Sequence, residues 1–210
     1  MKKFKAAVIG CGKISERHLD AIVALDTVDL VAVCDVKADR AQKTAEKYSV
    51  KAYSDYIELF ESEQLDAVHI CLPHYLHTVV AQKAFCYGIN VLCEKPMAVN
   101  SAEAEEMFSC AQENGVLLME AMWARLVPGT LKLLQLVDEG VLGEILGVEG
   151  KFCYTMDEDE MDHHVFKPEN GGGSLLDVGV YGLNFASWYL GKDVEEINAQ
   201  ASVYNGVDSH

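Results

Sequence analysis

Two glycines and an aspartate near the N-terminus have the types and the spacing of a dinucleotide site. Gly10 ends an apolar run that begins at Phe4, and Gly12 follows two residues later. A glycine at the first position lets the chain reverse sharply, and one at the second leaves room for a pyrophosphate beside the next helix N-terminus. Asp35 ends the next apolar run, where a carboxylate can accept hydrogen bonds from an adenosine ribose. The pattern predicts a dinucleotide-binding strand, turn and helix.

The third small residue of this turn departs from the usual dinucleotide fingerprint. Ser15 stands where a glycine is usual. A small side chain there still lets the helix pack closely on the strand, although G-x-G-x-x-S by itself is a weak signal. An ordinary strand-to-helix turn in an unrelated α/β protein is the alternative.

A second group of polar side chains recurs at helical spacing toward the other end of the chain. At 100° per residue, one helical face carries Asp177, Tyr181, Asn184 and Trp188. A simply solvated face is one explanation of this stripe. The stripe contains no lysine and no second acid, so it is a poor solvation face. An aspartate, a tyrosine and an asparagine together make a reasonable polyol-binding face.

Alternating strands and helices must position the two glycines and Asp35. Apolar runs typical of buried strands lie at 4–10, 28–34, 50–55, 67–72, 90–94 and 116–120. Helical patterns lie between them at 16–25, 38–48, 56–62, 76–88 and 101–114, the last with Ser101 placed as its cap. Such repeats build a doubly wound parallel sheet that binds ligands at the carboxyl ends of its strands. We expect an α/β fold with a Rossmann domain over residues 1–122.

The pattern changes after Arg125 and predicts a second, smaller domain over residues 123–210. Its expected elements are a helix from Pro128 through Glu139, a long strand at 144–155, a helix at 174–191 and a last strand at 195–204. So few strands cannot bury their own apolar face well. We therefore expect an incomplete α+β domain with an open-faced sheet, which needs further strands or a partner chain.

Composition limits the classes of partner. The chain has 210 residues, half of them hydrophobic, and a formal net charge of −16. Such an acidic balance argues against nucleic acid and anionic membranes, because both need basic residues to neutralise phosphate. No apolar run approaches the length of a membrane span. The seven cysteines are scattered and mostly within apolar strands, which is typical of reduced residues in a cytoplasmic protein.

Four motifs stand in order along the chain. They are the glycine turn, Cys71-Leu72-Pro73-His74 with His77, Glu94-Lys95-Pro96, and Gly171-Gly172-Gly173 leading to Asp177. Together they resemble the glucose–fructose oxidoreductase and inositol dehydrogenase family (Gfo/Idh/MocA), over essentially the whole chain. Segments 118–128 and 166–184 most resemble the branch with dimeric dihydrodiol dehydrogenase and D-xylose dehydrogenase. The resemblance implies an NAD(P)-dependent oxidoreductase of sugars or other vicinal diols.

The resemblance also implies that Lys95, Tyr181 and Asp177 are catalytic. Oxidising a carbinol sends a hydride to the nicotinamide and requires a group to take the hydroxyl proton. The pKa of an unperturbed tyrosine, about 10, is high for this task, but a nearby ammonium lowers it. Lys95 would supply that charge, and in reduction Tyr181 would donate the proton. Asp177 would bind a substrate hydroxyl or orient the lysine. A surface lysine before a turn proline is the alternative for Lys95.

Two positions of the helical face differ from many members of the family. Those members carry a histidine where this chain has Tyr181 and an aspartate where it has Asn184. The tyrosine version is that of the branch named above.

The remaining site residues are likewise implied by the resemblance. The expected cofactor contacts are Gly10, Gly12, Lys13, Ile14, Asp35, Leu72, Pro73, His74, His77, Glu94, Lys95, Trp123 and Arg125. The expected substrate contacts are Trp123, Phe152, Asp177 and Asn184. A structural role is equally open for His69, His74 and His77, and a core role for the two aromatic residues.

The choice between NAD and NADP depends on the residues after the second strand. Asp35 would accept from the 2′-hydroxyl of NAD and repel the 2′-phosphate of NADP, which favours NAD. Lys37 and Arg40 could instead bind that phosphate. His163 and His164, beside five acids at 157–162, suggest a metal site as an alternative. Because that loop lacks fixed ligand spacing, we expect no metal.

Family chains continue well beyond a segment like 206–208, so this chain looks shortened at its C-terminus. The resemblance implies pairing into a homo-oligomer, such as a dimer, through the second-domain sheet. Two other functions remain open on the same fold: a non-catalytic dinucleotide-binding sensor and an NAD-dependent glycosidase. The presence of both Lys95 and Tyr181 favours net oxidoreduction.

Overall fold

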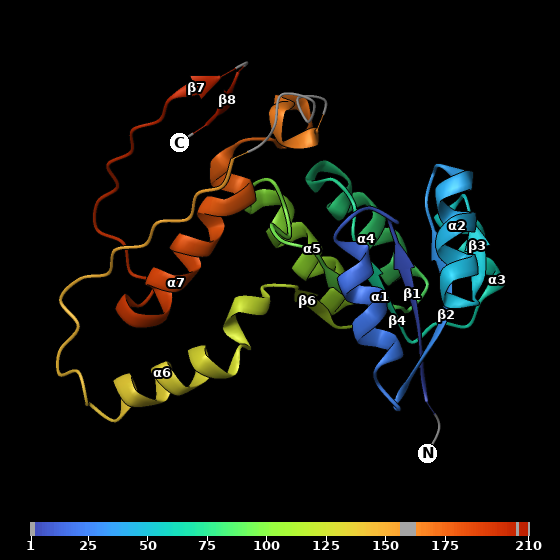
Figure 1. Cartoon of the computed structure of the whole chain (residues 1–210), viewed down its shortest axis with the longest axis horizontal. Helices are drawn as coiled ribbons and strands as arrows, with labels where there is room; N and C mark the ends of the chain where they lie inside the picture. The colour runs from blue at the N-terminus through green and yellow to red at the C-terminus, as the bar shows by residue number, and fades with distance from the viewer. Residues whose placement is uncertain (1–2, 156–162, 205, 210) are drawn as a thin grey trace. The chain divides into compact units, whose positions relative to one another are not determined.

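Two units make up the chain, and the division falls between Ala121 and Met122. A computed structural model describes residues 3–155, 163–204 and 206–209 (Figure 1). The acidic loop expected at 157–162 lies outside these residues. Within them, no helix combines the length and the apolar character that crossing a membrane requires.

A six-stranded parallel sheet forms the first unit, in the order β3-β2-β1-β4-β5-β6. The strands are β1 (Phe4–Ile9), β2 (Val28–Cys34), β3 (Lys51–Tyr53), β4 (Ala67–Ile70), β5 (Asn90–Cys93) and β6 (Leu118–Glu120). This is the strand order of dinucleotide-binding doubly wound proteins, and it confirms the predicted fold class. The order reverses between β1 and β4, where such folds bind their ligand.

Helices cover both faces of this sheet (Figure 1). They are α1 (Ser15–Val23), α2 (Ala38–Tyr48), α3 (Tyr56–Ser62), α4 (His77–Cys86) and α5 (Ser101–Glu113), with a 3₁₀ turn, η1 (His74–Leu76), before α4. Successive residues of β1 point to opposite faces. Val8 therefore belongs to one core cluster with Leu19 of α1, and Ile9 to another with Phe85 of α4.

The N-terminus of α5 corrects one prediction. Asn100, and not Ser101, caps this helix, because its side-chain oxygen accepts from the backbone N–H of Glu103 at 2.9 Å. Its amide nitrogen also donates to the Glu103 carboxylate at 3.0 Å. A capping residue needs an extended backbone, which Asn100 has and the first helical residue lacks.

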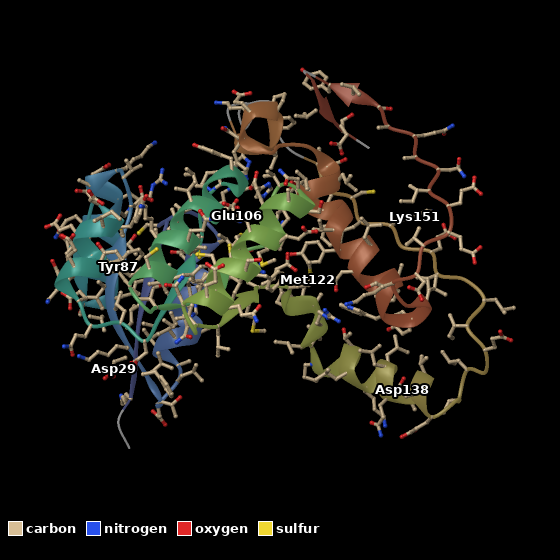
Figure 2. All side chains as sticks on the ribbon, turned by 180° about the vertical axis from the view of Figure 1, so that it is seen from behind. Asp29, Tyr87, Glu106, Met122, Asp138 and Lys151 are labelled. Atoms are coloured by element: carbon tan, nitrogen blue, oxygen red, sulfur yellow. The ribbon has the colours of Figure 1, made fainter. Side chains whose placement is uncertain are left out.

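The second unit contains two longer helices joined by irregular chain. Its elements are η2 (Trp123–Arg125), α6 (Pro128–Asp138), the 3₁₀ turns η4 (His164–Phe166) and η5 (Pro168–Asn170), the π-helical turn η6 (Leu175–Gly179), α7 (Val180–Leu190), β7 (Val203–Tyr204) and β8 (Val207–Asp208). Figure 2 labels Asp138 at the end of α6 and Lys151 in the segment that follows.

The long strand expected at 144–155 is wrong, because this segment has no helical or strand structure. The strand expected at 195–204 is reduced to β7, which pairs antiparallel with β8 through Val203↔Asp208. A strand is stabilised by hydrogen bonds to a neighbour, and segment 144–155 has no neighbouring strand among the described residues. Its aromatic side chains contact the helical segment 175–190 instead.

Candidate functional site

The turn after β1 combines one glycine that the backbone requires with one that leaves space open. Gly10 has a φ of +93°, and a Cβ there would lie 2.2 Å from the carbonyl oxygen of Cys71. A Cβ on Gly12 would meet no atom within 4 Å. Ser15 is buried, and its hydroxyl donates to the Gly12 carbonyl at 2.6 Å. The open backbone of Gly12 at the N-terminus of α1 fits a pyrophosphate.

Asp35 ties this turn to the end of β2. One carboxylate oxygen accepts from the backbone N–H of Cys11, and the other accepts from that of Lys37, both at 2.9 Å. The guanidinium of Arg40 lies 3.3 Å from the first oxygen. Because each carboxylate oxygen can accept more than one hydrogen bond, Asp35 can also accept from a ribose hydroxyl. The guanidinium of Arg40, a predicted phosphate ligand, therefore lies beside Asp35.

The carboxylate of Glu94 links Lys95 to helix α1. The Glu94 Oε1 atom lies 2.7 Å from Nε2 of His18, and Oε2 accepts the backbone N–H of Lys95 at 3.1 Å. The backbone N–H of Glu94 donates to Ile70 at the end of β4. Lys95 therefore lies on a backbone segment that is fixed from β4 and from α1.

Two further contacts hold the other end of this segment. The backbone N–H of Met97 donates to the Glu120 carboxylate at 2.9 Å. The ring of His77 is fully buried between two carbonyl oxygens, with Nδ1 2.9 Å from that of Pro96 and Nε2 2.8 Å from that of Leu72. Burial lowers the pKa of His77, although the two carbonyls act in the opposite direction. Both ring nitrogens of His77 therefore face acceptors from the protein.

His74, also buried, packs edge-on against His77 with ring centroids 5.9 Å apart. Pro73 precedes it and is half-buried, and the exposed Lys13 and Ile14 follow Gly12. The structure thus brings the predicted first-unit residues to the carboxyl ends of β1, β2, β4 and β5.

In the second unit, Tyr181 lies between two aromatic side chains. The indole N–H of Trp123 in η2 donates to the phenol oxygen of Tyr181 at 3.0 Å. The ring of Phe152 stacks on that of Tyr181, with centroids 5.2 Å apart and an interplanar angle of 12°. Three residues predicted for the substrate site or for catalysis, from three separate segments, are therefore in contact.

The other polar residues of this helical face have distinct surroundings. The hydroxyl of Tyr154 donates to the carboxylate of Asp177 in η6. The side-chain oxygen of Asn184 is buried and has no hydrogen-bond partner in the described part of the chain. The guanidinium of Arg125 lies over the ring of Trp188, 5.6 Å from its centroid. Asp177 and Asn184 offer oxygens that could bind hydroxyl groups of a substrate.

The backbone conformation and close packing at Gly173 explain why the last residue of the triple glycine has no side chain. Gly173 has a φ of +114°, and a Cβ there would lie 2.0 Å from Oδ1 of Asp208. The Asp208 carboxylate accepts from the hydroxyl of Ser174 at 2.7 Å and from the backbone N–H of Leu175 at 2.6 Å. Asp208 therefore holds the start of the helical segment that carries Asp177 and Tyr181.

Sequence reasoning missed His18 and Tyr154. His18 lies three residues after the buried Ser15, so helical spacing could have placed it against the sheet. Tyr154 stands two residues after Phe152, on the same side of an extended chain. The predicted cooperation of Lys95 with Tyr181 stays a prediction, since these residues belong to different units.

The alternative of a metal site rested on His163 and His164, whose ring centroids lie 4.2 Å apart. The five acids that would complete such a site lie outside the described residues. Within residues 3–155, 163–204 and 206–209, no group of three or more histidine, cysteine, aspartate or glutamate residues could hold a metal ion.

The strand order, the open Gly12 turn and the placement of Asp35 define a dinucleotide-binding Rossmann protein. The chain belongs to the oxidoreductase family with an NAD-binding Rossmann fold, whose model matches residues 4–122, and the GFO/IDH/MocA C-terminal domain matches residues 130–210. The family predicted from the sequence motifs is thereby confirmed.

Several curated proteins are similar to this chain. It is 34% identical over 196 residues to dTDP-3,4-didehydro-2,6-dideoxy-alpha-D-glucose 3-reductase from Actinomadura kijaniata, covering 93% of this chain and 58% of that protein. It is 36% identical over 181 residues to scyllo-inositol 2-dehydrogenase (NADP(+)) from Bacillus subtilis (strain 168), covering 83% and 55%. With trans-1,2-dihydrobenzene-1,2-diol dehydrogenase from Danio rerio it shares 34% over 211 residues, covering 96% and 61%.

Among solved structures, a 3-ketoreductase from Actinomadura kijaniata in complex with NADP and TDP-benzene superposes with a TM-score of 0.84 at 32% identity. That match covers 90% of this chain and 58% of the other. The chain thus spans between one half and two thirds of the length of the curated relatives named here.

Proposed function

We propose that this protein is an NAD(P)-dependent oxidoreductase that interconverts a secondary alcohol and a carbonyl in a sugar or another vicinal diol. The observation that carries the proposal is the hydrogen bond from Trp123 to Tyr181, together with the stacked Phe152. Because the phenol oxygen accepts from the indole, the phenol keeps its own proton for another acceptor. A phenol fixed in this way suits proton exchange with a substrate hydroxyl.

Cofactor binding in this proposal uses the first unit. The open backbone at Gly12 takes the pyrophosphate, and Asp35 takes an adenosine ribose hydroxyl. Arg40, close to Asp35, is suited to a 2′-phosphate, so the site can serve NAD or NADP. We favour NAD, because the buried Asp35 carboxylate repels that phosphate. A bound nicotinamide supplies the hydride acceptor or donor.

The proton and the substrate are handled by residues of this chain. In oxidation Tyr181 acts as the phenolate, having given up its own proton, and takes the proton of the reacting hydroxyl; in reduction the phenol gives its proton to the carbonyl oxygen. The ammonium of Lys95 favours the negative charge on oxygen that develops in either direction. Asp177 and Asn184 bind neighbouring hydroxyl groups of the diol and orient it.

The relatives support this assignment. The named relatives are a sugar-nucleotide 3-reductase, an inositol dehydrogenase and a dihydrodiol dehydrogenase, all of which act on a carbon that bears a hydroxyl or keto group. The 3-ketoreductase was also crystallised as a lysine-to-alanine and as a tyrosine-to-phenylalanine variant. These are the two residue types on which the proposed mechanism rests.

A steady-state assay of absorbance at 340 nm tests the proposal. Each cofactor is combined with pentoses, hexoses, inositols and trans-dihydrodiols, for the native chain and for Tyr181→Phe. We expect turnover with at least one diol and a loss of about 100-fold or more in kcat for the variant. Cofactor binding without turnover across the whole panel would contradict the proposal in favour of a sensor. Release of a sugar without net NADH would contradict it in favour of a glycosidase.

A further inference from the structure

We propose that His18 is a positioning residue for Lys95, acting through Glu94, with His69 behind it. The three side chains form one line of contacts from β4 through α1 to the segment after β5. Nδ1 of His69 lies 3.0 Å from Nδ1 of His18, and Nε2 of His18 lies 2.7 Å from Oε1 of Glu94. The other oxygen of Glu94 accepts the backbone N–H of Lys95 at 3.1 Å. The proposed chemistry does not use His18 or His69.

The identity of each atom fixes where the protons lie. A carboxylate oxygen only accepts, so Nε2 of His18 must carry a proton and donate it to Glu94. When His18 is neutral, its Nδ1 is therefore an acceptor, and His69 donates from its own Nδ1. With one proton on each ring, the neutral pair satisfies both contacts.

Because the side chains of His18 and Glu94 are largely buried, losing the hydrogen bond between them has a high cost in free energy. The side chain of His18 is 10% exposed and that of Glu94 is 9% exposed. A buried carboxylate that loses its donor must either find another partner or shift, because water cannot replace the bond. Any shift of Glu94 takes the backbone of Lys95 with it, since the same carboxylate accepts the Lys95 N–H.

The titratable neighbours of His18 and Glu94 with shifted pKa values are neutral at physiological pH. Burial and the charge of His18 lower the pKa of His69 to about 4, so His69 stays neutral at physiological pH. His77, Cys71 and Cys93 also lie near Glu94. Burial lowers the pKa of His77, and burial together with the charge of Glu94 raises the pKa of both thiols, so these groups are also neutral.

This inference rests on the proposed function only in giving Lys95 a catalytic task. The geometry itself predicts that His18 controls the position of Lys95 whether or not the chain turns over a substrate. The test therefore uses a structural readout first and turnover second.

The first measurement is nuclear magnetic resonance of the ¹⁵N-labelled chain. We expect the His18 ring to carry a proton on Nε2 at every pH between 5.5 and 8, and the Lys95 amide to exchange slowly with solvent. In His18→Leu the Lys95 amide should exchange about tenfold faster or more, because its acceptor is no longer held. In His18→Gln a side-chain amide replaces the Nε2 donor, so exchange should stay within about threefold of the native rate.

His163→Gln is the matched control, because His163 is exposed and lies in the other unit. It should leave the Lys95 amide unchanged. An unprotonated Nε2 on His18 in the native chain would overturn the proposal. So would a folded His18→Leu variant whose Lys95 amide exchanges at the native rate. If His18→Leu does not fold, the ring tautomer in the native chain and the exchange rate in His18→Gln decide the question.

The second measurement separates a positioning role from a merely structural one. With a substrate found in the 340 nm assay, His18→Leu should lower kcat about tenfold to 100-fold while the dissociation constant of NADH, measured by fluorescence, changes less than about threefold. His18→Gln should restore most of kcat, because its side-chain amide replaces the Nε2 donor. Equal loss of cofactor affinity and turnover would contradict a positioning role. Absence of turnover in the native chain would contradict the proposed function alone, and the amide and ring readouts would still test His18.

Discussion

The indole N–H of Trp123 donates to the phenol oxygen of Tyr181 across 3.0 Å, and the two rings meet edge to face with centroids 6.1 Å apart. Trp123 comes from the short turn that opens the second unit and Tyr181 from α7, 58 residues later. The bond fixes the rotation of the phenol while leaving its proton available. Its removal should therefore affect the chemical step more than substrate binding.

Substituting Trp123 by phenylalanine keeps an aromatic ring and removes the N–H. We expect kcat to fall about tenfold, which corresponds to the loss of one hydrogen bond to a group that bears charge during the reaction. Phe152→Leu is the control, since it removes the stacked ring and retains the hydrogen bond. It should raise KM more than it lowers kcat. Steady-state kinetics of both variants check this, and equal kcat values for Trp123→Phe and the native chain would refute the role given to the bond.

The two glycines of the first turn should respond oppositely to alanine. Gly10→Ala places a Cβ 2.2 Å from the Cys71 carbonyl oxygen at a φ of +93°. We expect it to lower the free energy of unfolding by about 3 kcal/mol or more, measured by urea denaturation. Gly12→Ala meets open space, so it should change stability by less than about 1 kcal/mol and weaken NADH binding at least tenfold. Unchanged NADH affinity in Gly12→Ala would argue against a pyrophosphate at this turn.

Histidines with lowered pKa values should make the first unit less stable in mild acid. The pKa of His69 is lowered to about 4, mainly by burial, whereas an unfolded histidine titrates near pH 6.5. Between these values the unfolded chain binds more protons than the folded chain, so stability falls as the pH falls. From pH 7 to pH 5 the contribution of His69 amounts to about 2 kcal/mol. The lowered pKa of His77 acts in the same direction.

Urea denaturation at several pH values measures this effect. The variant His69→Gln should lose less stability between pH 7 and pH 5 than the native chain, by about 2 kcal/mol. His163→Gln, at an exposed position, serves as the control and should follow the native curve. The account of His69 is wrong if His69→Gln and the native chain have the same slope.

Asp35 and Arg40 should set the preference between the two cofactors. The carboxylate of Asp35 repels a 2′-phosphate, and Arg40 lies 3.3 Å from it. Asp35→Ser should shift the ratio of NADPH to NADH affinity at least tenfold toward NADPH, because the guanidinium then has no competing anion at this position. Arg40→Leu should shift the same ratio toward NADH. Fluorescence titration with each cofactor checks both variants, and a shift in the same direction for the two would contradict this view.

Most of the first unit could be predicted from sequence because its signals are local. Helices α2 and α3 have the predicted bounds, and each strand ends within two residues of the apolar run that predicted it. Apolar runs that end at glycine or proline specify buried strands whatever their partners. The Asn100 cap was missed because two adjacent residues both had capping side chains, and only the backbone conformation decides between them.

The features that the sequence did not predict depend on contacts between residues far apart in the chain. Segment 144–155 has the composition of a strand, but a strand also needs a neighbour, which no local pattern reveals. His18 and Glu94 are 76 residues apart, and their contact depends on the packing of α1 against the sheet. The contact of Phe152 with Tyr181 also joins distant parts of the chain, although segment 144–155 does not form the predicted strand.

The central claim is that Lys95 and Tyr181 act on the same hydroxyl group. A double-mutant cycle tests it most directly, with kcat measured for the native chain, Lys95→Met, Tyr181→Phe and the double variant. We expect each single substitution to lower kcat about 100-fold or more, and the double variant to be within about threefold of the slower single variant, because residues that act as a unit are not additive. A double variant whose loss equals the product of the two single losses, or a Tyr181→Phe variant with native kcat, would contradict the account.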